Sequence, residues 1–317
     1  MKSRIKARKL EKGDTIGTFT ASNPITDEVN VWLQNGIKKL QSLGFKVVTS
    51  KNIFRKNYYT AGTPEERASD FMELVENENV NAILTTMGGE NAHQILPLID
   101  FSKVKSNPKI IMGHSDPTVL INPINKKTNL ITFYGHHVCS FDPNWPWFSN
   151  DYDLKYFRKI LMNDKAPGLI EESTERETWR KGIAEGEFVG GCLTDFKKLI
   201  GTSFEPEFKN KILILEQIGE TPQEINVILT YLKHAGVFDK INGLLLGKFY
   251  ECVDKKHEDW NKSLKQLFLD ELKEYDFPIL KTEDFGHFSH MFPVPIGGMG
   301  RINTTNKKIE ILENVVV

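Results

Sequence analysis

The sequence predicts an α/β protein: an N-terminal domain built on a parallel, helix-covered sheet, followed by a smaller, mixed α/β C-terminal domain. Two observations lead to this prediction. Short apolar segments alternate with amphipathic segments through the first half, which is the pattern of a parallel sheet with helices on both faces. The chain also has 317 residues, more than one compact core usually absorbs, so we expect two domains, residues 1–150 and 151–317.

The first half contains apolar segments of strand length that are separated by segments with helical spacing. The predicted strands cover residues 14–20, 45–49, 80–86 and 110–112. The first helix follows Ser22, Asn23 and Pro24, which supply capping and turn chemistry. Residues 64–76 and 91–99 are the next two predicted helices. Helices placed between parallel strands in this order predict a flavodoxin-like domain.

The second half continues the alternation of strands and helices after an interruption. A stretch rich in proline, tryptophan and asparagine, with one charged helix, lies between about residues 142 and 168. Such a stretch is typical of a connection between domains, so we place the boundary near Asn150. Beyond it the expected strands cover residues 211–215 and 241–246, and the expected helices cover residues 222–234 and 261–275.

Composition and charge exclude several classes of protein. The 41 basic and 42 acidic residues leave a net charge of −1, so no overall field attracts a nucleic acid polymer or an anionic membrane. The apolar runs are far shorter than the ~18 to 20 residues of a membrane-spanning helix. The basic first dozen residues precede no apolar stretch, so we expect no secretory signal. Cys139, Cys192 and Cys252 have no C-x-x-C spacing, which favours a reducing cytoplasm.

The most informative motif is the segment 109–118, where an apolar strand runs into a Gly-His-Ser-Asp turn and a helix start. A serine at such a turn projects from the carboxyl edge of the sheet, and the next amide points toward an oxyanion formed on its substrate. Ser115 is therefore a candidate nucleophile, with the amide of Asp116 as an oxyanion donor. The alternative is that Ser115 or Asp116 only caps the helix, with Pro117 at its first position.

A second motif is the pair Gly88-Gly89, which also lies between a predicted strand and a predicted helix. Bare backbone amides there can approach an anionic ligand closely. Loops after neighbouring parallel strands lie at the same edge of a sheet, so we expect Gly88, Gly89 and Ser115 to meet in one crevice. The alternative is an ordinary turn that needs glycine for a positive φ.

A serine nucleophile needs a base and a group that orients this base. Among the eight histidines, His287 stands out because it follows Gly286 in a loop after a short strand-like run at residues 278–281. Among the carboxylates, Glu216 follows the apolar run 212–215, so we expect it at the carboxyl edge of a strand. A buried acid at that place needs a partner.

These motifs, in this order and spacing, resemble the S66 family of serine carboxypeptidases. The residues that carry the resemblance are Gly88-Gly89, Gly113-His114-Ser115-Asp116, Leu215-Glu216 and Gly286-His287, and it extends over nearly the whole chain. The resemblance implies a triad in which Ser115 is the nucleophile, His287 the general base and Glu216 the orienting acid. It also implies an oxyanion hole made by the amides of Gly89 and Asp116, a homodimer, and a reaction that needs no cofactor.

The resemblance covers two branches of the family with different substrates. LD-carboxypeptidases trim murein peptides, whereas immunity hydrolases of the MccF type cleave peptidyl or aminoacyl nucleotides. The segment 87–91 lacks the Arg-Gly-Gly-Tyr-Gly pattern associated with the murein enzymes, which favours the MccF type. Cys192 and Glu220 stand where the family pattern has asparagine and a lysine suited to a nucleotide phosphate, so phosphate binding is the weaker part of the resemblance.

Other residues are candidate substrate contacts. Besides Gly88 and Glu220, Trp179 can stack on a base or sugar, and Arg180 can pair with a carboxylate or phosphate. The alternative for Trp179 and Arg180 is packing in a loop or an interface.

Two further alternatives concern metals and catalysis. A zinc set can be written from His136, His137, Cys139, His287 and His290, but adjacent histidines point apart and no ligand spacing repeats, so we expect no metal site. The alternative to an enzyme is a binding module that keeps the fold and sequesters a peptide or nucleotide without turnover.

Overall fold

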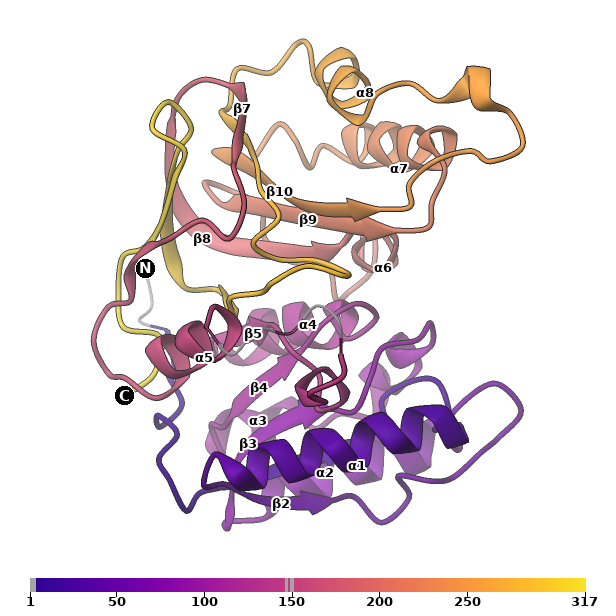
Figure 1. Cartoon of the computed structure of the whole chain (residues 1–317), viewed down its shortest axis with the longest axis vertical. Helices are drawn as coiled ribbons and strands as arrows, with labels where there is room; N and C mark the ends of the chain where they lie inside the picture. The colour runs from indigo at the N-terminus through magenta and orange to yellow at the C-terminus, as the bar shows by residue number, and fades with distance from the viewer. Residues whose placement is uncertain (1–3, 146–147, 149–150) are drawn as a thin grey trace.

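The computed structural model describes residues 4–145, 148 and 151–317. Figure 1 shows the N-terminal half, from indigo to magenta, below the C-terminal half. One hydrogen-bonded path of strands runs through both halves in the order β2-β1-β3-β4-β5-β12-β8-β9-β10-β11-β7. Most neighbours on this path are parallel, which confirms the predicted α/β fold class.

The N-terminal half is a parallel sheet with helices packed on it. Its strands are β1 (Thr15–Phe19), β2 (Lys46–Thr49), β3 (Val80–Thr85), β4 (Ile110–Gly113) and β5 (Thr132–Tyr134), and its helices are α1 (Asp27–Ser42), α2 (Pro64–Glu76), α3 (Phe101–Ser106) and α4 (Thr118–Thr128), with the 3₁₀ segments η1 (Ala92–Leu98) and η2 (Cys139–Phe141). The side chains of β3 and β4 are almost wholly buried, as expected for central strands covered on both faces.

The C-terminal half has a second group of parallel strands and a small antiparallel unit. Its strands are β6 (Gly168–Ile170), β7 (Glu177–Arg180), β8 (Ile183–Cys192), β9 (Ile212–Ile218), β10 (Gly243–Tyr250), β11 (Ile279–Lys281), β12 (Val294–Ile296), β13 (Met299–Asn303) and β14 (Lys308–Ile311). Its helices are α5 (Asp153–Leu161), α6 (Leu193–Lys197), α7 (Pro222–His234) and α8 (Leu264–Glu271), with the 3₁₀ segment η3 (Glu258–Trp260). Strand β12 joins the halves because it pairs with both β5 and β8.

Two helices have the bounds that the sequence predicts, since each carries a complete start signal. In α2 the hydroxyl of Thr63 accepts from the amide of Glu66, and the Glu66 carboxylate accepts from the amide of Thr63. Thr221 and Glu224 form the same capping box at the start of α7. Each helix also has proline in its first turn, where the missing N–H costs nothing.

Other boundaries differ from the prediction for physical reasons. The expected helix at 91–99 is the 3₁₀ segment η1, because Pro97 has no N–H to continue an α-helix. The expected helix at 261–275 is shortened to α8, whose start is capped by Ser263. Helix α1 is capped by Thr26 rather than by Ser22, which is buried in a polar network described below.

The position of Glu216 was also predicted wrongly. Strand β9 continues to Ile218, so Glu216 lies inside the strand and pairs with Cys192 of β8 instead of following the strand end. The predicted domain boundary near Asn150 lies outside the described residues.

Candidate active site

Ser115 lies in the turn between β4 and α4. Its backbone φ is +64°, in the left-handed region that residues other than glycine rarely adopt. Holding a serine there costs on the order of 1–3 kcal/mol, which the surrounding structure must offset. The start of α4 has no side-chain cap, so the interpretation of Ser115 or Asp116 as a helix cap is wrong. The turn instead holds a partly exposed serine at the end of a buried strand.

The loop after β3 lies directly against Ser115, as the sequence predicts. A Cβ atom added to Gly88 would lie 2.9 Å from the Cβ and 3.0 Å from the Oγ of Ser115, and 3.8 Å from the amide nitrogen of Asp116. Gly89 follows with a φ of +147°. Only glycine at position 88 lets this loop approach the serine so closely, whereas a Cβ added to Gly89 would meet Ser22 and Asn23.

Glu216 and His287 form a hydrogen-bonded pair. The Nδ1 of His287 lies 2.8 Å from Oε2 and 3.1 Å from Oε1 of Glu216, and the backbone amide of His287 donates to Oε2 at 2.8 Å. Glu216 is fully buried. Gly286 makes this approach possible, since its φ is +118° and an added Cβ would lie 3.0 Å from Oε2 of Glu216. An Nδ1–H that donates to the carboxylate leaves Nε2 as a proton acceptor.

The charge of Glu216 sets the titration of His287. Burial lowers the pKa of His287, but the carboxylate and the hydrogen bond of Glu216, with a smaller contribution from Asp195, outweigh this effect. The pKa of His287 is therefore raised above its usual 6.5. A base with such a pKa is strong enough to accept a proton from a hydroxyl near neutral pH.

Tyr134, at the end of β5, joins the two parts of this site and was missed by the sequence reasoning. Its hydroxyl donates to Oε1 of Glu216 at 2.6 Å and accepts from the backbone amide of Ser115 at 3.2 Å. Burial, and then Glu216, raise the pKa of Tyr134 well above its usual value, so the hydroxyl keeps its proton. A tyrosine ending a buried strand was the available signal, because a buried phenol needs a polar partner.

His114 packs beside His287. Its ring centre lies 4.3 Å from that of His287, and burial followed by the neighbouring histidines lowers the pKa of His114 well below 6.5. Neither ring nitrogen of His114 has a hydrogen-bond partner among the described residues. Among the residues that the structure describes, no hydrogen bond joins Ser115 Oγ to His287.

The site residues include one set with metal-ligand chemistry. Ligand atoms of His114, Glu216 and His287 lie within 4.8 Å of one another, and no other such set is found among the residues that the structure describes. Both oxygens of Glu216 are already engaged by His287 and Tyr134, so an ion would compete with these hydrogen bonds.

The zinc set considered from the sequence is not assembled. His136 and His290 both bind the buried carboxylate of Asp153, at 2.8 and 3.0 Å, whereas Nδ1 of His137 lies 2.8 Å from the hydroxyl of Thr85. The imidazoles of His136 and His137 thus bind different partners, as expected for adjacent residues.

Two of the candidate substrate contacts make packing contacts within the C-terminal half. Trp179 and Arg180 are in β7, the last strand of the path. The guanidinium of Arg180 donates to the backbone oxygens of Leu272 at 2.8 Å and Phe277 at 3.3 Å, and Trp179 packs on Phe268 of α8. These contacts match the packing alternative for both residues.

Glu220, the remaining charged candidate, lines an open groove of about 760 Å³ together with Thr194 and Trp260. Its carboxylate lies 3.5 Å from the hydroxyl of Thr194. Burial, followed by the neighbouring Glu224, raises the pKa of Glu220. A separate cavity of about 40 Å³ borders His287 and His114 directly.

Among the described residues, no helix has the length and apolar character needed to span a membrane.

Comparison with known proteins gives the same family along both halves of the chain. Residues 16–135 match the LD-carboxypeptidase N-terminal domain of peptidase S66, and residues 185–302 match the LD-carboxypeptidase C-terminal domain. The chain is 32% identical over 336 residues to the microcin C7 self-immunity protein MccF of Escherichia coli, covering 97% of this chain and 95% of the relative. It is 33% identical over 309 residues to the probable murein peptide carboxypeptidase of Bacillus subtilis (strain 168), covering 95% of this chain and 92% of that relative.

Solved structures agree with the sequence comparison. The structure of MccF in complex with glutamyl sulfamoyl guanosine superposes with a TM-score of 0.88 at 30% identity, covering 98% of this chain and 99% of that one. The resemblance found from the sequence is confirmed: the chain belongs to peptidase family S66, the LD-carboxypeptidases, and is an enzyme of the serine carboxypeptidase type.

Proposed function

We propose that this enzyme hydrolyses a C-terminal amide bond through an acyl-enzyme on Ser115, with His287 as general base and Glu216 as orienting acid. The observation that carries the proposal is the arrangement of the site. A strained serine turn lies beside Gly88, and the phenol of Tyr134 links the amide of this serine to the carboxylate that holds His287. Such a set of groups is suited to acyl transfer to water.

In the proposed mechanism Ser115 Oγ attacks the substrate carbonyl while Nε2 of His287 takes the hydroxyl proton. The amides of Gly89 and Asp116 hold the oxyanion that develops, and Glu216 stabilises the imidazolium. His287 then gives its proton to the leaving nitrogen, and the C–N bond breaks. Water, activated by the same imidazole, hydrolyses the ester and restores Ser115.

We propose peptidyl or aminoacyl nucleotides as the substrate class. This choice is supported by the solved complexes of MccF with glutamyl sulfamoyl guanosine and aspartyl sulfamoyl adenosine, at 30 and 31% identity to this chain. A murein tetrapeptide is the second candidate, favoured by the similarity to the murein peptide carboxypeptidase of Bacillus subtilis. The carboxylate of Glu220 in the groove also favours it, because this charge repels a phosphate when ionised.

The test compares hydrolysis of an aminoacyl sulfamoyl adenosine and an L,D-linked murein tetrapeptide by the parent protein and Ser115→Ala. We expect turnover of one substrate by the parent and a loss of at least about 10⁴-fold in the variant, with an unchanged thermal midpoint. A serine-reactive phosphonate should label the parent at Ser115. Undiminished hydrolysis by the variant would refute the nucleophile, and tight binding without turnover or labelling would favour a binding module.

The homodimer and the cytoplasmic location implied by the sequence remain predictions. Sedimentation velocity of the purified chain tests the first directly, and fractionation of cells that express it tests the second.

A further inference from the structure

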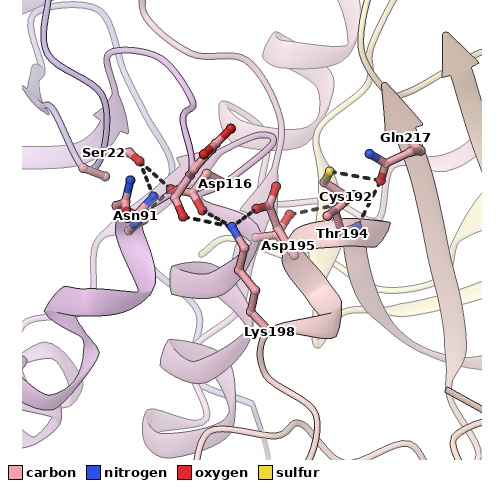
Figure 2. A network of polar contacts seen from close by, with 12 residues as sticks. Ser22, Asn91, Asp116, Cys192, Thr194, Asp195, Lys198 and Gln217 are labelled. Carbon is pink, nitrogen blue, oxygen red and sulfur yellow. Dashed lines mark hydrogen bonds and ion pairs between the residues drawn. The ribbon is translucent and has the colours of Figure 1, made fainter. Parts of the chain in front are cut away.

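A buried polar network connects the two halves of the molecule beside the proposed oxyanion hole. Figure 2 shows Lys198, which directly follows α6, reaching between Asp116 and Asp195. Its ammonium donates to the backbone oxygen of Glu90 at 2.9 Å, to Oδ1 of Asp116 at 3.3 Å and to Oδ1 of Asp195 at 2.7 Å. Two of these three acceptors belong to the N-terminal half and one belongs to α6.

The two acceptors in the N-terminal half belong to the loops that supply the proposed oxyanion donors. Glu90 directly follows Gly89, and Asp116 carries one of the two proposed amides itself. The carboxylate of Asp116 also ties these loops to each other, since its Oδ2 accepts from the amide of Ala92 at 2.7 Å and from the hydroxyl of Ser22 at 2.6 Å. Lys198 therefore holds both loops through a single charged group.

The other end of the network leads to the strand that carries the proposed acid. Within α6, the amide of Thr194 donates to the side-chain oxygen of Gln217 at 3.0 Å, and Gln217 directly follows Glu216 in β9. Figure 2 shows this contact together with the thiol of Cys192, which lies 3.6 Å from the same oxygen. A chain of direct contacts thus runs from β9 through α6 and Lys198 to the two loops.

The charges in this network need the ammonium. The side chain of Asp116 is fully buried and that of Asp195 is 8% exposed, whereas that of Lys198 is 28% exposed. Burial, and then the charge of Asp116, raise the pKa of Asp195 to about 7 even though Lys198 lowers it. Removing the ammonium would leave buried carboxylates without a compensating charge. The loops would then rearrange to expose the carboxylates to water, or the carboxylates would take up a proton.

We propose that Lys198 is a positioning residue for catalysis, which fixes the loops carrying the Gly89 and Asp116 amides relative to the Glu216–His287 pair. This inference rests on the proposed function. Donors held by a fixed framework stabilise an oxyanion more than donors that must reorganise, and displacement of such groups by about 1 Å can cost about 10²-fold in rate. Lys198 itself contacts neither the serine nor the base among the described residues.

The experiment measures kcat and KM for Lys198→Met, Lys198→Arg and Lys198→Gln on the substrate that the parent hydrolyses. We expect Lys198→Met to lower kcat by about 10- to 100-fold with KM changed less than about threefold, because the amides act mainly in the transition state. Lys198→Arg should recover part of the loss. Lys126→Met is the matched control: Lys126 in α4 also donates to a backbone oxygen of the other half, Ser203 at 3.2 Å, but among the described residues it makes no hydrogen bond to the two loops.

A second readout separates positioning from a loss of folding. A boronic acid adduct on Ser115 mimics the oxyanion, so Lys198→Met should weaken its binding at least about tenfold. Binding of the intact substrate, measured in the Ser115→Ala background, should change less than about threefold. If Lys198→Met does not fold, the same two quantities are measured for Lys198→Gln, whose side-chain amide keeps a hydrogen-bond donor group.

The proposal is overturned if the folded Lys198 variants keep the kcat and the boronic acid affinity of Lys126→Met. It is also overturned if substrate binding falls as much as kcat. Failure of the proposed function would look different, since the parent protein itself would then show neither turnover nor labelling of Ser115.

Discussion

The two sides of the active site are built by different means. On the N-terminal side, the position of Ser115 depends on shape: a left-handed backbone and the close approach of Gly88. On the C-terminal side, the position of His287 depends on charge and hydrogen bonds to the buried Glu216. Steric changes should therefore damage the N-terminal side, whereas changes of charge should damage the C-terminal side and alter its pH dependence.

Among the changes that distinguish the two sides, the largest effect is expected from a change of charge on the C-terminal side. Glu216→Gln keeps the shape of the side chain but removes the charge that raises the pKa of His287. As the proposed base, His287 works only when neutral, so we expect the activity of the parent to fall as the pH drops through a pKa above 6.5. In the variant this pKa is lower, so the acidic limb of kcat/KM should move to lower pH.

The same substitution should lower kcat by about 10²- to 10⁴-fold. The neutral side-chain amide at position 216 cannot stabilise the imidazolium of His287 or fix its tautomer as the carboxylate does. A pH–rate profile of parent and variant measures both effects. An acidic limb that stayed in place would show that Glu216 does not control the titration of the base.

A steric change on the N-terminal side should have a smaller effect of a different kind. In Gly88→Ala the new methyl group would lie 2.9 Å from Cβ of Ser115, so the serine or the loop must shift. We expect kcat to fall by about 10²-fold with no movement of the acidic limb, since His287 keeps its partners. Gly168→Ala is the control: its φ of +64° strains the backbone, but an added Cβ meets nothing within 4 Å, so this variant shows the effect of strain without a clash at the serine. Equal losses of activity in the two variants would contradict the steric role of Gly88.

The smallest effect is expected where the two sides meet. Tyr134→Phe removes the hydroxyl that donates to Glu216 and accepts from the amide of Ser115, but it keeps the ring. One hydrogen bond to a buried charge is lost, so kcat should fall by about tenfold. The free energy of unfolding, measured in urea, should fall by about 1–3 kcal/mol. Turnover and urea titrations give the two numbers. An unchanged kcat would mean that the two sides do not depend on this contact.

Much of the local structure could be predicted from the sequence, because the signals act over a few residues. Helices α2 and α7 were predicted with their observed bounds, since each begins with a capping box and a proline. The contact between Gly88 and Ser115 was also predicted, since neighbouring parallel strands place their following loops at one edge. Ser22 was misassigned as part of a helix start because its partner, Asp116, lies 94 residues away.

The sequence by itself determined the α/β class, the serine turn and, through its motifs, the family. Only the tertiary structure decided which distant groups share the site: Tyr134 between Ser115 and Glu216, and Lys198 between the two loops and α6. It also placed Trp179 and Arg180 against α8. The physical reason is that capping, glycine conformations and apolar alternation are encoded by near neighbours, whereas a buried polar group finds its partner only when remote strands and helices pack together.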